Sequence, residues 1–210
     1  HGVIMHGEQD MTEDGRRKPT TYYQPSSGVG AAMAAKQVRG AVRVGVIGLG
    51  AGTLAAYGRK GDLFRFYDIN SQVVSVARSQ FTFLSDSEAA NEVVLGDARL
   101  SLEREPPQGF DLLAVDAFSS DAIPIHLITK EALAVYLRHV KPDGIVAFHV
   151  SNRFLSLVPV VARIAKENGA HAVLVSDRGK DGDDDHTTTD WVLVSRDLKA
   201  LEAPEIEEVS

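Results

Sequence analysis

Three glycines and an aspartate are spaced in this sequence as a nucleoside site requires. Gly48, Gly50 and Gly52 alternate directly after the apolar run 42–47. Because glycine lacks a Cβ atom, these positions can adopt positive φ and let the backbone approach a ligand. Asp68 follows Gly48 by 20 residues, where a carboxylate can accept hydrogen bonds from both hydroxyls of a ribose. The alternative interpretation is structural: the glycines would only allow a helix to pack closely on a strand.

Acidic residues also end the third and fourth apolar segments. Asp97 and Ala98 follow residues 93–95, and Asp97 is predicted to accept a hydrogen bond from an adenine amino group. Asp116 ends the segment 110–116, and Asp121 follows it within VDAFSSDAIP. In the functional interpretation a carboxylate here holds an amine, and Asp116 removes its proton as a general base, typically worth a factor of about 10² to 10⁴. In the structural interpretation both acids are turn and helix-capping residues.

The glycine pattern separates two classes of cofactor. A dinucleotide site uses G-x-G-x-x-G with the pyrophosphate on a helix N-terminus, whereas here the third glycine comes one residue earlier and Thr53 takes its place. A G-x-G-x-G turn followed by acids at successive strand ends suits a sulfonium nucleoside, which brings no phosphate to repel the carboxylates. S-adenosylmethionine or decarboxylated S-adenosylmethionine is therefore favoured over NAD. The sequence has no G-x-x-x-x-G-K-[ST] string, so a Walker-type phosphate loop is rejected.

Alternating strand-like and helix-like segments are expected to position these residues. The predicted strands are short apolar runs, at residues 42–47, 63–69, 93–95, 110–116, 144–150, 172–176 and 191–195. The predicted helices have apolar residues three and four apart, at 71–81, 98–105, 129–140 and 155–168. This alternation predicts an α/β fold with a doubly wound, mostly parallel sheet that residues 191–195 close. The stretch Lys141-Pro142-Asp143-Gly144 is predicted to end a helix and form a turn.

The predicted domain organisation has three parts. Residues 1–40 are rich in glycine, serine, threonine and charge, and we expect a small N-terminal β extension of short strands and turns, with a brief helix near 29–38. Residues 41–198 form the catalytic domain, and residues 199–210 a C-terminal tail. Within the strands, His149 is predicted to be a buried, hydrogen-bonded histidine, and Trp191 a core residue.

Composition excludes several classes of function. The net charge of −7 disfavours a nucleic-acid partner, and the lack of cysteine excludes disulfides, thiolate zinc sites and a cysteine nucleophile. The seven histidines show no metal-binding spacing, and residues 177–190 do not fit a calcium loop, so no metal is expected. No apolar run approaches the roughly 20 residues that span a bilayer. We expect a cytoplasmic protein or the soluble domain of a membrane protein whose membrane segments lie outside this sequence.

Five motifs in order resemble the polyamine aminopropyltransferases, the spermidine synthase family. They are an N-terminal island with Tyr22 and Tyr23, the glycine turn, YDIN at 67–70, GDAR at 96–99 and VDAFSSDAIP at 115–124. The resemblance covers roughly residues 1–195 and is closest to the spermidine-synthase-like domains that some bacteria fuse to transporter-like membrane segments. It implies a class I methyltransferase-like, Rossmann-like fold that carries an aminopropyl group from decarboxylated S-adenosylmethionine to putrescine or a similar amine.

The resemblance also implies roles for individual residues. Asp68 would bind the ribose, Asp97 the adenine, and Asp116 would be the general base. Tyr22 or Tyr23 would line the amine channel, and Gln9 would lie near the donor. Because the family commonly pairs its subunits, a homodimer is implied.

Two departures from the family pattern leave other functions open. The family has an aspartate after its third glycine, in G-G-G-D-G, to hold the donor's ammonium, whereas this chain has Gly50-Ala51-Gly52. Its two catalytic acids are three residues apart, whereas Asp116 and Asp121 are five apart. The alternatives are therefore an S-adenosylmethionine-dependent methyltransferase and a nucleoside-binding regulatory domain.

Overall fold

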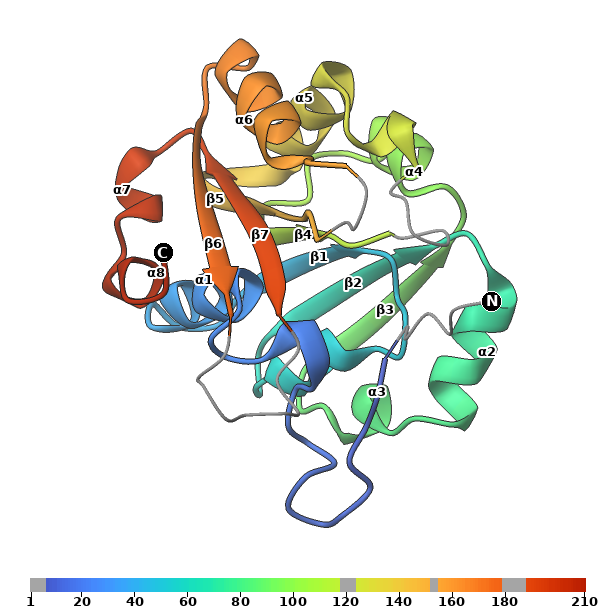
Figure 1. The fold of residues 1–210 in the computed structure, drawn as a ribbon. Helices are drawn as coiled ribbons and strands as arrows, with labels where there is room; N and C mark the ends of the chain where they lie inside the picture. Colours follow the sequence, from blue (N-terminus) through green and yellow to red (C-terminus); the bar gives the residue numbers. More distant parts are fainter. Residues whose placement is uncertain (1–6, 118–123, 152–154, 179–187) are drawn as a thin grey trace.

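A seven-stranded mixed sheet forms the centre of the molecule (Figure 1). The computed structural model describes residues 7–117, 124–151, 155–178 and 188–210. The strand order is β3-β2-β1-β4-β5-β7-β6, and β7 alone runs antiparallel to its neighbours. The strands are β1 (Arg43–Ile47), β2 (Leu63–Asp68), β3 (Ala90–Leu95), β4 (Phe110–Val115), β5 (Val140–His149), β6 (His171–Asp177) and β7 (Thr189–Ser195). The α/β, doubly wound class predicted from the sequence is confirmed.

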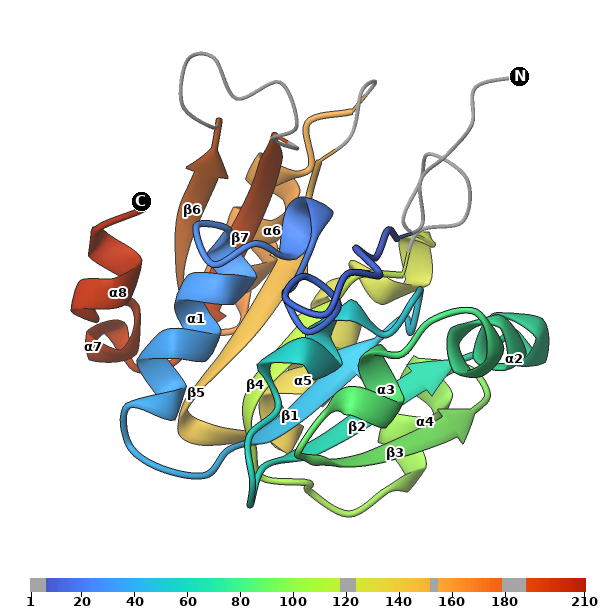
Figure 2. The same ribbon diagram turned by 90° about the horizontal axis from the view of Figure 1, so that it is seen from below.

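Helices cover both faces of this sheet (Figure 2). One face packs against α1 (Gly28–Gln37), η2 (Thr53–Tyr57), α2 (Ser71–Ser79), α3 (Phe83–Asp86), α7 (Leu198–Leu201) and α8 (Pro204–Glu207). The other packs against α4 (Ala98–Arg104), α5 (Lys130–His139) and α6 (Val158–Glu167). Two 3₁₀ turns, η1 (Thr21–Tyr23) and η3 (Ile125–Leu127), complete the described elements.

The central strands β1 and β4 are apolar along most of their length because both of their faces are covered. In β4 every residue after Asp111 is buried, and in β1 every residue after Arg43. The helices, in contrast, bury one stripe each. In α5, Thr129 caps the first turn by accepting from the Ala132 N–H, and the buried side chains recur three and four residues apart. The predicted helices at 71–81, 98–105, 129–140 and 155–168 are confirmed with small shifts at their ends.

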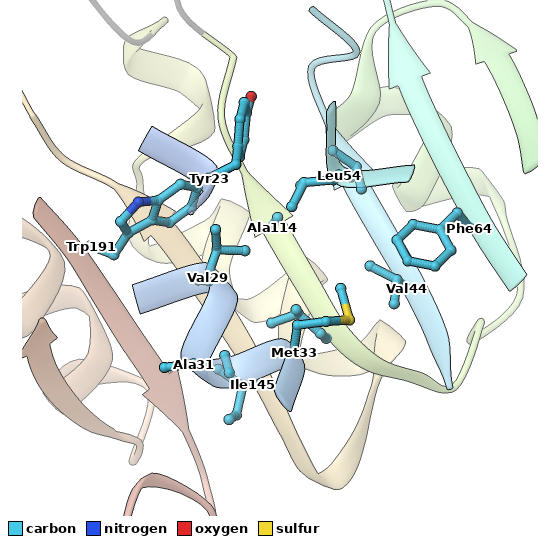
Figure 3. Packing of buried hydrophobic residues seen from close by; sticks show 14 of the residues in the cluster. Tyr23, Val29, Ala31, Met33, Val44, Leu54, Phe64, Ala114, Ile145 and Trp191 are labelled. Atoms are coloured by element: carbon cyan, nitrogen blue, oxygen red, sulfur yellow. The ribbon is translucent and has the colours of Figure 1, made fainter. Parts of the chain in front are cut away.

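The core on the α1 face reaches from the middle of the sheet to its edge at the carboxyl ends of the parallel strands. Figure 3 shows Met33 among Val44, Ile145 and other side chains, and Tyr23 beside Trp191. Trp191 is fully buried, so its prediction as a core residue is confirmed. Tyr23 therefore belongs to the same core as α1 and the central strands.

The prediction of short strands in the N-terminal extension is wrong for the part that the structure describes. The whole of 7–40 lies in the described ranges and contains no strand; it holds η1 and α1. The reason is compositional, since the segment GVGAAMAAKQ is rich in alanine, the best helix former, and packs its small apolar side chains on the sheet. The brief helix expected near 29–38 is confirmed. At the other end of the chain, α8 packs on α1 and α7 packs on β5 and β7, and Leu201 and Ile206 are buried.

Two finer expectations differ from the structure, and one short element was not predicted. The stretch 141–144 belongs to β5 and bulges out where the pairing with β4 shifts between Phe110 and Leu112. The run after the glycine turn is a five-residue 3₁₀ helix, η2, which Gly58 follows in an extended conformation. Residues 191–195 do not close the sheet, because β7 lies between β5 and β6. At 141–144 and 191–195, pairing across the sheet outweighs the local pattern.

Candidate functional site

The glycine turn lies at the carboxyl end of β1 and has the predicted backbone conformation. The φ angles are +96° at Gly48, +53° at Gly50 and +83° at Gly52, a region that residues with a Cβ atom rarely adopt. Gly48 also has a structural role, although not the helix packing that was expected, because a Cβ atom there would lie 2.4 Å from the Asp116 carbonyl oxygen just after β4. The turn is thus required by the fold at its first glycine.

Asp68 ends β2 and holds the glycine turn. Its Oδ2 atom accepts the Leu49 N–H at 2.9 Å, and its Oδ1 atom accepts the Asn70 N–H at 2.8 Å. These two bonds fix the carboxylate beside the turn, and each oxygen keeps a further lone pair for a ligand. The structure therefore brings together the two parts that the sequence spacing paired.

Ile69, which follows Asp68, was missed by the sequence reasoning. Its side chain is 73% exposed at the same strand end, where an apolar surface suits one face of an aromatic base. The available signal was an apolar residue placed directly after the acid at a strand end.

Asp97 caps the first turn of α4, a role that the sequence analysis did not predict for it. Its Oδ1 atom accepts the Leu100 N–H at 2.8 Å at the start of α4, and Oδ2 lies 3.0 Å from Nε2 of His126 in η3. Ala98, the first residue of α4, is buried. Asp97 remains partly exposed, at 22% of its side chain, so an adenine contact stays a prediction.

Asp116 lies just after β4 in a buried cluster that also contains Tyr23 and His149. The Tyr23 hydroxyl donates to Oδ2 of Asp116, and Nδ1 of His149 lies 2.7 Å from Oδ1. The Asp116 and His149 side chains are only 2% and 7% exposed. Because a carboxylate can only accept, the proton of the imidazole is assigned to Nδ1, and Nε2 then carries a lone pair unless the ring is charged. A buried carboxylate is thus paired through both of its oxygens, as burial demands.

Two aromatic rings enclose the His149 imidazole. The Tyr22 ring stacks on it with 4.6 Å between centroids, and the Trp191 ring with 4.8 Å. Trp191 also donates from Nε1 to the Tyr22 carbonyl oxygen at 3.2 Å. Burial, and next the charge of Asp116, raise the pKa values of Tyr22 and Tyr23, so both hydroxyls keep their protons at neutral pH. The imidazole is therefore held in one plane.

Hydroxyl groups lie at the other side of this imidazole. Nε2 of His149 is 3.0 Å from the Ser151 Oγ and 3.2 Å from the Thr189 Oγ1. Ser151 also accepts the Asp190 N–H at 2.8 Å and, unlike Asp116, is partly exposed. A hydrogen-bonded chain thus runs from a partly exposed serine through the imidazole to a buried carboxylate.

Two further site predictions concern Asp121 and Gln9. Asp121 lies outside the described residues. Both ends of the Gln9 amide form hydrogen bonds within the protein. Its Nε2 atom donates to the Arg16 carbonyl and to the Thr82 hydroxyl, and its Oε1 atom accepts the Thr82 N–H. A contact of Gln9 with the donor therefore stays a prediction.

His149 was predicted as a buried, hydrogen-bonded histidine, which is confirmed, but its pairing with Asp116 was missed. Both residues lie at carboxyl ends of neighbouring parallel strands, β4 and β5. That placement was the signal that could have joined them.

Other features of the described residues are few. An open hollow of about 200 Å³ lies away from the Asp116 cluster, between the N-terminal segment and α3, where it is lined by Arg16, Arg17, Phe83 and Asp86 among others.

Within the described ranges no group of histidine and acidic side chains could hold a metal ion. In those same ranges, no helix has the length and apolar character needed to cross a bilayer.

Comparison with solved structures identifies the fold as class I methyltransferase-like. Spermidine synthase from Thermotoga maritima superposes with a TM-score of 0.62 at 15% identity, over 86% of this chain and 60% of that one. Human methyltransferase-like protein 13 in complex with SAH gives 0.61 at 16% identity, over 87% and 88%. The O-methyltransferase from Bacillus cereus in complex with SAH gives 0.58 at 18% identity, over 81% and 80%.

These likenesses concern the fold. The chain spans about three fifths of the length of the Thermotoga maritima spermidine synthase. Neither the protein-family models nor the curated proteins gave a match.

Proposed function

We propose that this chain transfers an alkyl group from a sulfonium nucleoside to a nucleophilic acceptor. The observation that carries the proposal is the pairing of the positive-φ glycine turn with Asp68, whose Oδ2 atom accepts the Leu49 N–H. An adenosine at this strand end would meet bare backbone, a carboxylate for its ribose hydroxyls, and the exposed Ile69 side chain for its base. The likeness to solved spermidine synthases and methyltransferases supports the same assignment.

The more specific proposal is aminopropyl transfer from decarboxylated S-adenosylmethionine to putrescine or a similar amine. It is supported by the order of the motifs and by the contact between Tyr23 and Asp116, which links the N-terminal tyrosine island to the proposed base. The acceptor nitrogen would attack the carbon bound to sulfur, and methylthioadenosine would leave. In this proposal Asp97 contacts the adenine, Gln9 lies near the donor, Asp121 contributes to amine binding, and two chains form a homodimer.

Methyl transfer from S-adenosylmethionine is the second candidate, and two observations favour it. Ala51 stands in the glycine turn where the resemblance would require an acid, and it is buried, at 4% exposure. Asp116 is enclosed with both oxygens bonded to Tyr23 and His149, so a cationic amine has no direct access to its carboxylate. The first observation removes a contact to the ammonium group of an aminopropyl donor, and the second removes a contact to a diamine acceptor.

Calorimetry with the two donors tests the class and separates the candidates. Titration with S-adenosylmethionine, its decarboxylated form and S-adenosylhomocysteine should show binding of at least one of them. Of the two donors, the one that binds with higher affinity indicates which group is transferred. Mass spectrometry after incubation with both donors and a panel of amines then identifies the product. If neither donor binds, the transferase proposal is wrong; if a donor binds and no acceptor in a broad panel is alkylated, a regulatory nucleoside-binding domain takes its place.

A further inference from the structure

The proposed transfer needs a group that accepts the proton of the incoming nucleophile. Asp116 is poorly placed to do so by direct contact. Its side chain is 2% exposed, Tyr23 occupies Oδ2 and His149 occupies Oδ1. Although each oxygen keeps a further lone pair, the burial of the side chain leaves almost no carboxylate surface that a substrate nitrogen could contact.

The His149 imidazole has the complementary arrangement. With its proton on Nδ1 directed at Asp116, its Nε2 lone pair faces the hydroxyls of Ser151 and Thr189. Ser151 is the partly exposed member of the chain. Its oxygen accepts the Asp190 N–H and lies 3.4 Å from the Thr189 Oγ1. When the Ser151 proton points to Nε2 and the Thr189 hydroxyl does not donate to Ser151, one lone pair remains for a substrate proton.

We propose that His149 is the proton acceptor of the transfer reaction, that Ser151 relays the proton, and that Asp116 positions the imidazole and stabilises its charged form. This inference rests on the proposed function. It changes the role of Asp116, expected from the sequence to act as the base itself, to that of a positioning residue.

The step balances in atoms and charge. The lone pair of the acceptor forms a bond to the carbon on sulfur, and the carbon–sulfur pair stays on sulfur, which becomes a neutral thioether. The acceptor's proton passes to the Ser151 oxygen while the Ser151 proton passes to Nε2 of His149. The positive charge that leaves the sulfonium thus reappears as an imidazolium beside the Asp116 carboxylate.

The chemistry of the two side chains favours this assignment. Imidazoles in unperturbed peptides titrate near pH 6.5 and aspartic acids near 3.9, and general bases work best with a pKa near the operating pH. The carboxylate below the ring fixes the tautomer and attracts the imidazolium that forms. Tyr22 and Tyr23, the titratable side chains that contact this pair within the described ranges, stay neutral, because their pKa values are raised by burial.

Substitution of His149 by glutamine tests the proposal. Glutamine can still donate to Asp116, but it cannot take up a proton. With whichever donor and acceptor the wild-type protein turns over, we expect kcat to fall by about 10² to 10⁴ while donor affinity stays unchanged. The wild-type rate should fall in acidic solution, and this pH dependence should be missing from the residual activity of His149→Gln. Ser151→Ala should also lower kcat, and His171→Gln, a change at an exposed histidine of β6, should leave the rate unaltered.

The outcomes separate this inference from the function on which it rests. Wild-type turnover together with an unchanged rate and pH profile in His149→Gln would overturn the inference and leave the transferase intact. If the wild-type protein shows no turnover, the proposed transferase function itself is contradicted. If His149→Gln does not fold, ¹⁵N NMR of the wild-type imidazole decides, because a neutral ring protonated at Nε2 instead of Nδ1 contradicts the relay.

Discussion

Tyr23 donates its hydroxyl proton to the carboxylate of Asp116, although 93 residues separate the two along the chain. Both residues are buried: counted over backbone and side chain together, Tyr23 is 5% exposed and Asp116 8%. The contact joins η1, which precedes the sheet, to the carboxyl end of β4. The N-terminal segment is therefore a part of the candidate site and also a part of the core.

Removing the Tyr23 hydroxyl should cost more than an ordinary hydrogen bond. In Tyr23→Phe a buried carboxylate loses one donor, and bonds to charged groups contribute about 1.5 to 3 kcal/mol. Tyr57→Phe is the matched control, because the Tyr57 hydroxyl donates at 2.5 Å to a neutral group, the Tyr23 carbonyl, and about 0.5 to 1.5 kcal/mol is expected. Urea denaturation of both variants measures the difference. Equal losses would mean that the carboxylate is satisfied without Tyr23.

Asp116→Asn should abolish turnover and leave the donor bound. An amide in place of the carboxylate carries no charge to stabilise the imidazolium and does not fix the His149 tautomer, so kcat should fall at least about 10²-fold. The proposed donor contacts come from the glycine turn and Asp68 and not from this enclosed side chain, so donor affinity should hold. Steady-state kinetics beside calorimetry separates the two effects. An active Asp116→Asn variant would remove Asp116 from the mechanism.

Gly48→Ala should destabilise the fold strongly. The new Cβ atom would lie 2.4 Å from the backbone oxygen of Asp116, in a residue whose φ is +96°. Gly109→Ala is the control, because Gly109 also has positive φ, +66°, but nothing lies within 4 Å of the added atom. We expect about 1 to 2 kcal/mol for the control from backbone strain alone and a clearly larger loss for Gly48→Ala, measured by thermal and urea denaturation. Losses of the same size would show that strand packing does not require this glycine.

Asp68→Ala should weaken donor binding. Two ribose hydroxyls would lose a charged acceptor, and each bond of this kind is worth about 1.5 to 3 kcal/mol. The glycine turn would also lose the bond from the Leu49 N–H. Asp111→Asn is the control, since Asp111 lies at the opposite end of its strand, where it accepts the Arg43 N–H and pairs with Lys141. Calorimetry should show weaker binding only for Asp68→Ala, and equal affinities would place the nucleoside elsewhere.

Stability should fall steeply in alkaline solution. Burial is the first cause of a raised pKa at all five tyrosines of the chain, Tyr22, Tyr23, Tyr57, Tyr67 and Tyr136. Above about pH 10 the unfolded tyrosines lose their protons while the folded ones keep them, so each such group lowers the free energy of unfolding by about 1.4 kcal/mol per pH unit. Below about pH 10 their stabilisation is fully present.

Urea denaturation between about pH 8 and pH 11, followed by phenolate absorbance, measures this dependence. The phenolate signal should rise together with unfolding. Tyrosines that titrate near pH 10 while the protein stays folded would contradict the expectation.

Local sequence determined the alternation of strands and helices, the conformation of the glycine turn and the burial of His149. Each depends on properties that a short segment carries by itself. Apolar periodicity decides which face of a helix is buried, an unbroken apolar run marks a strand covered on both sides, and the missing Cβ atom permits positive φ.

Tertiary structure alone decided the place of β7, the bulge at 141–144 and the pairing of Tyr23 and His149 with Asp116. Every strand offers the same backbone donors and acceptors to either neighbour and in either direction, so its partner depends on how distant segments pack. The Asp116 cluster has the same origin, because burial of a carboxylate is tolerated only where donors from η1 and β5 come together around it.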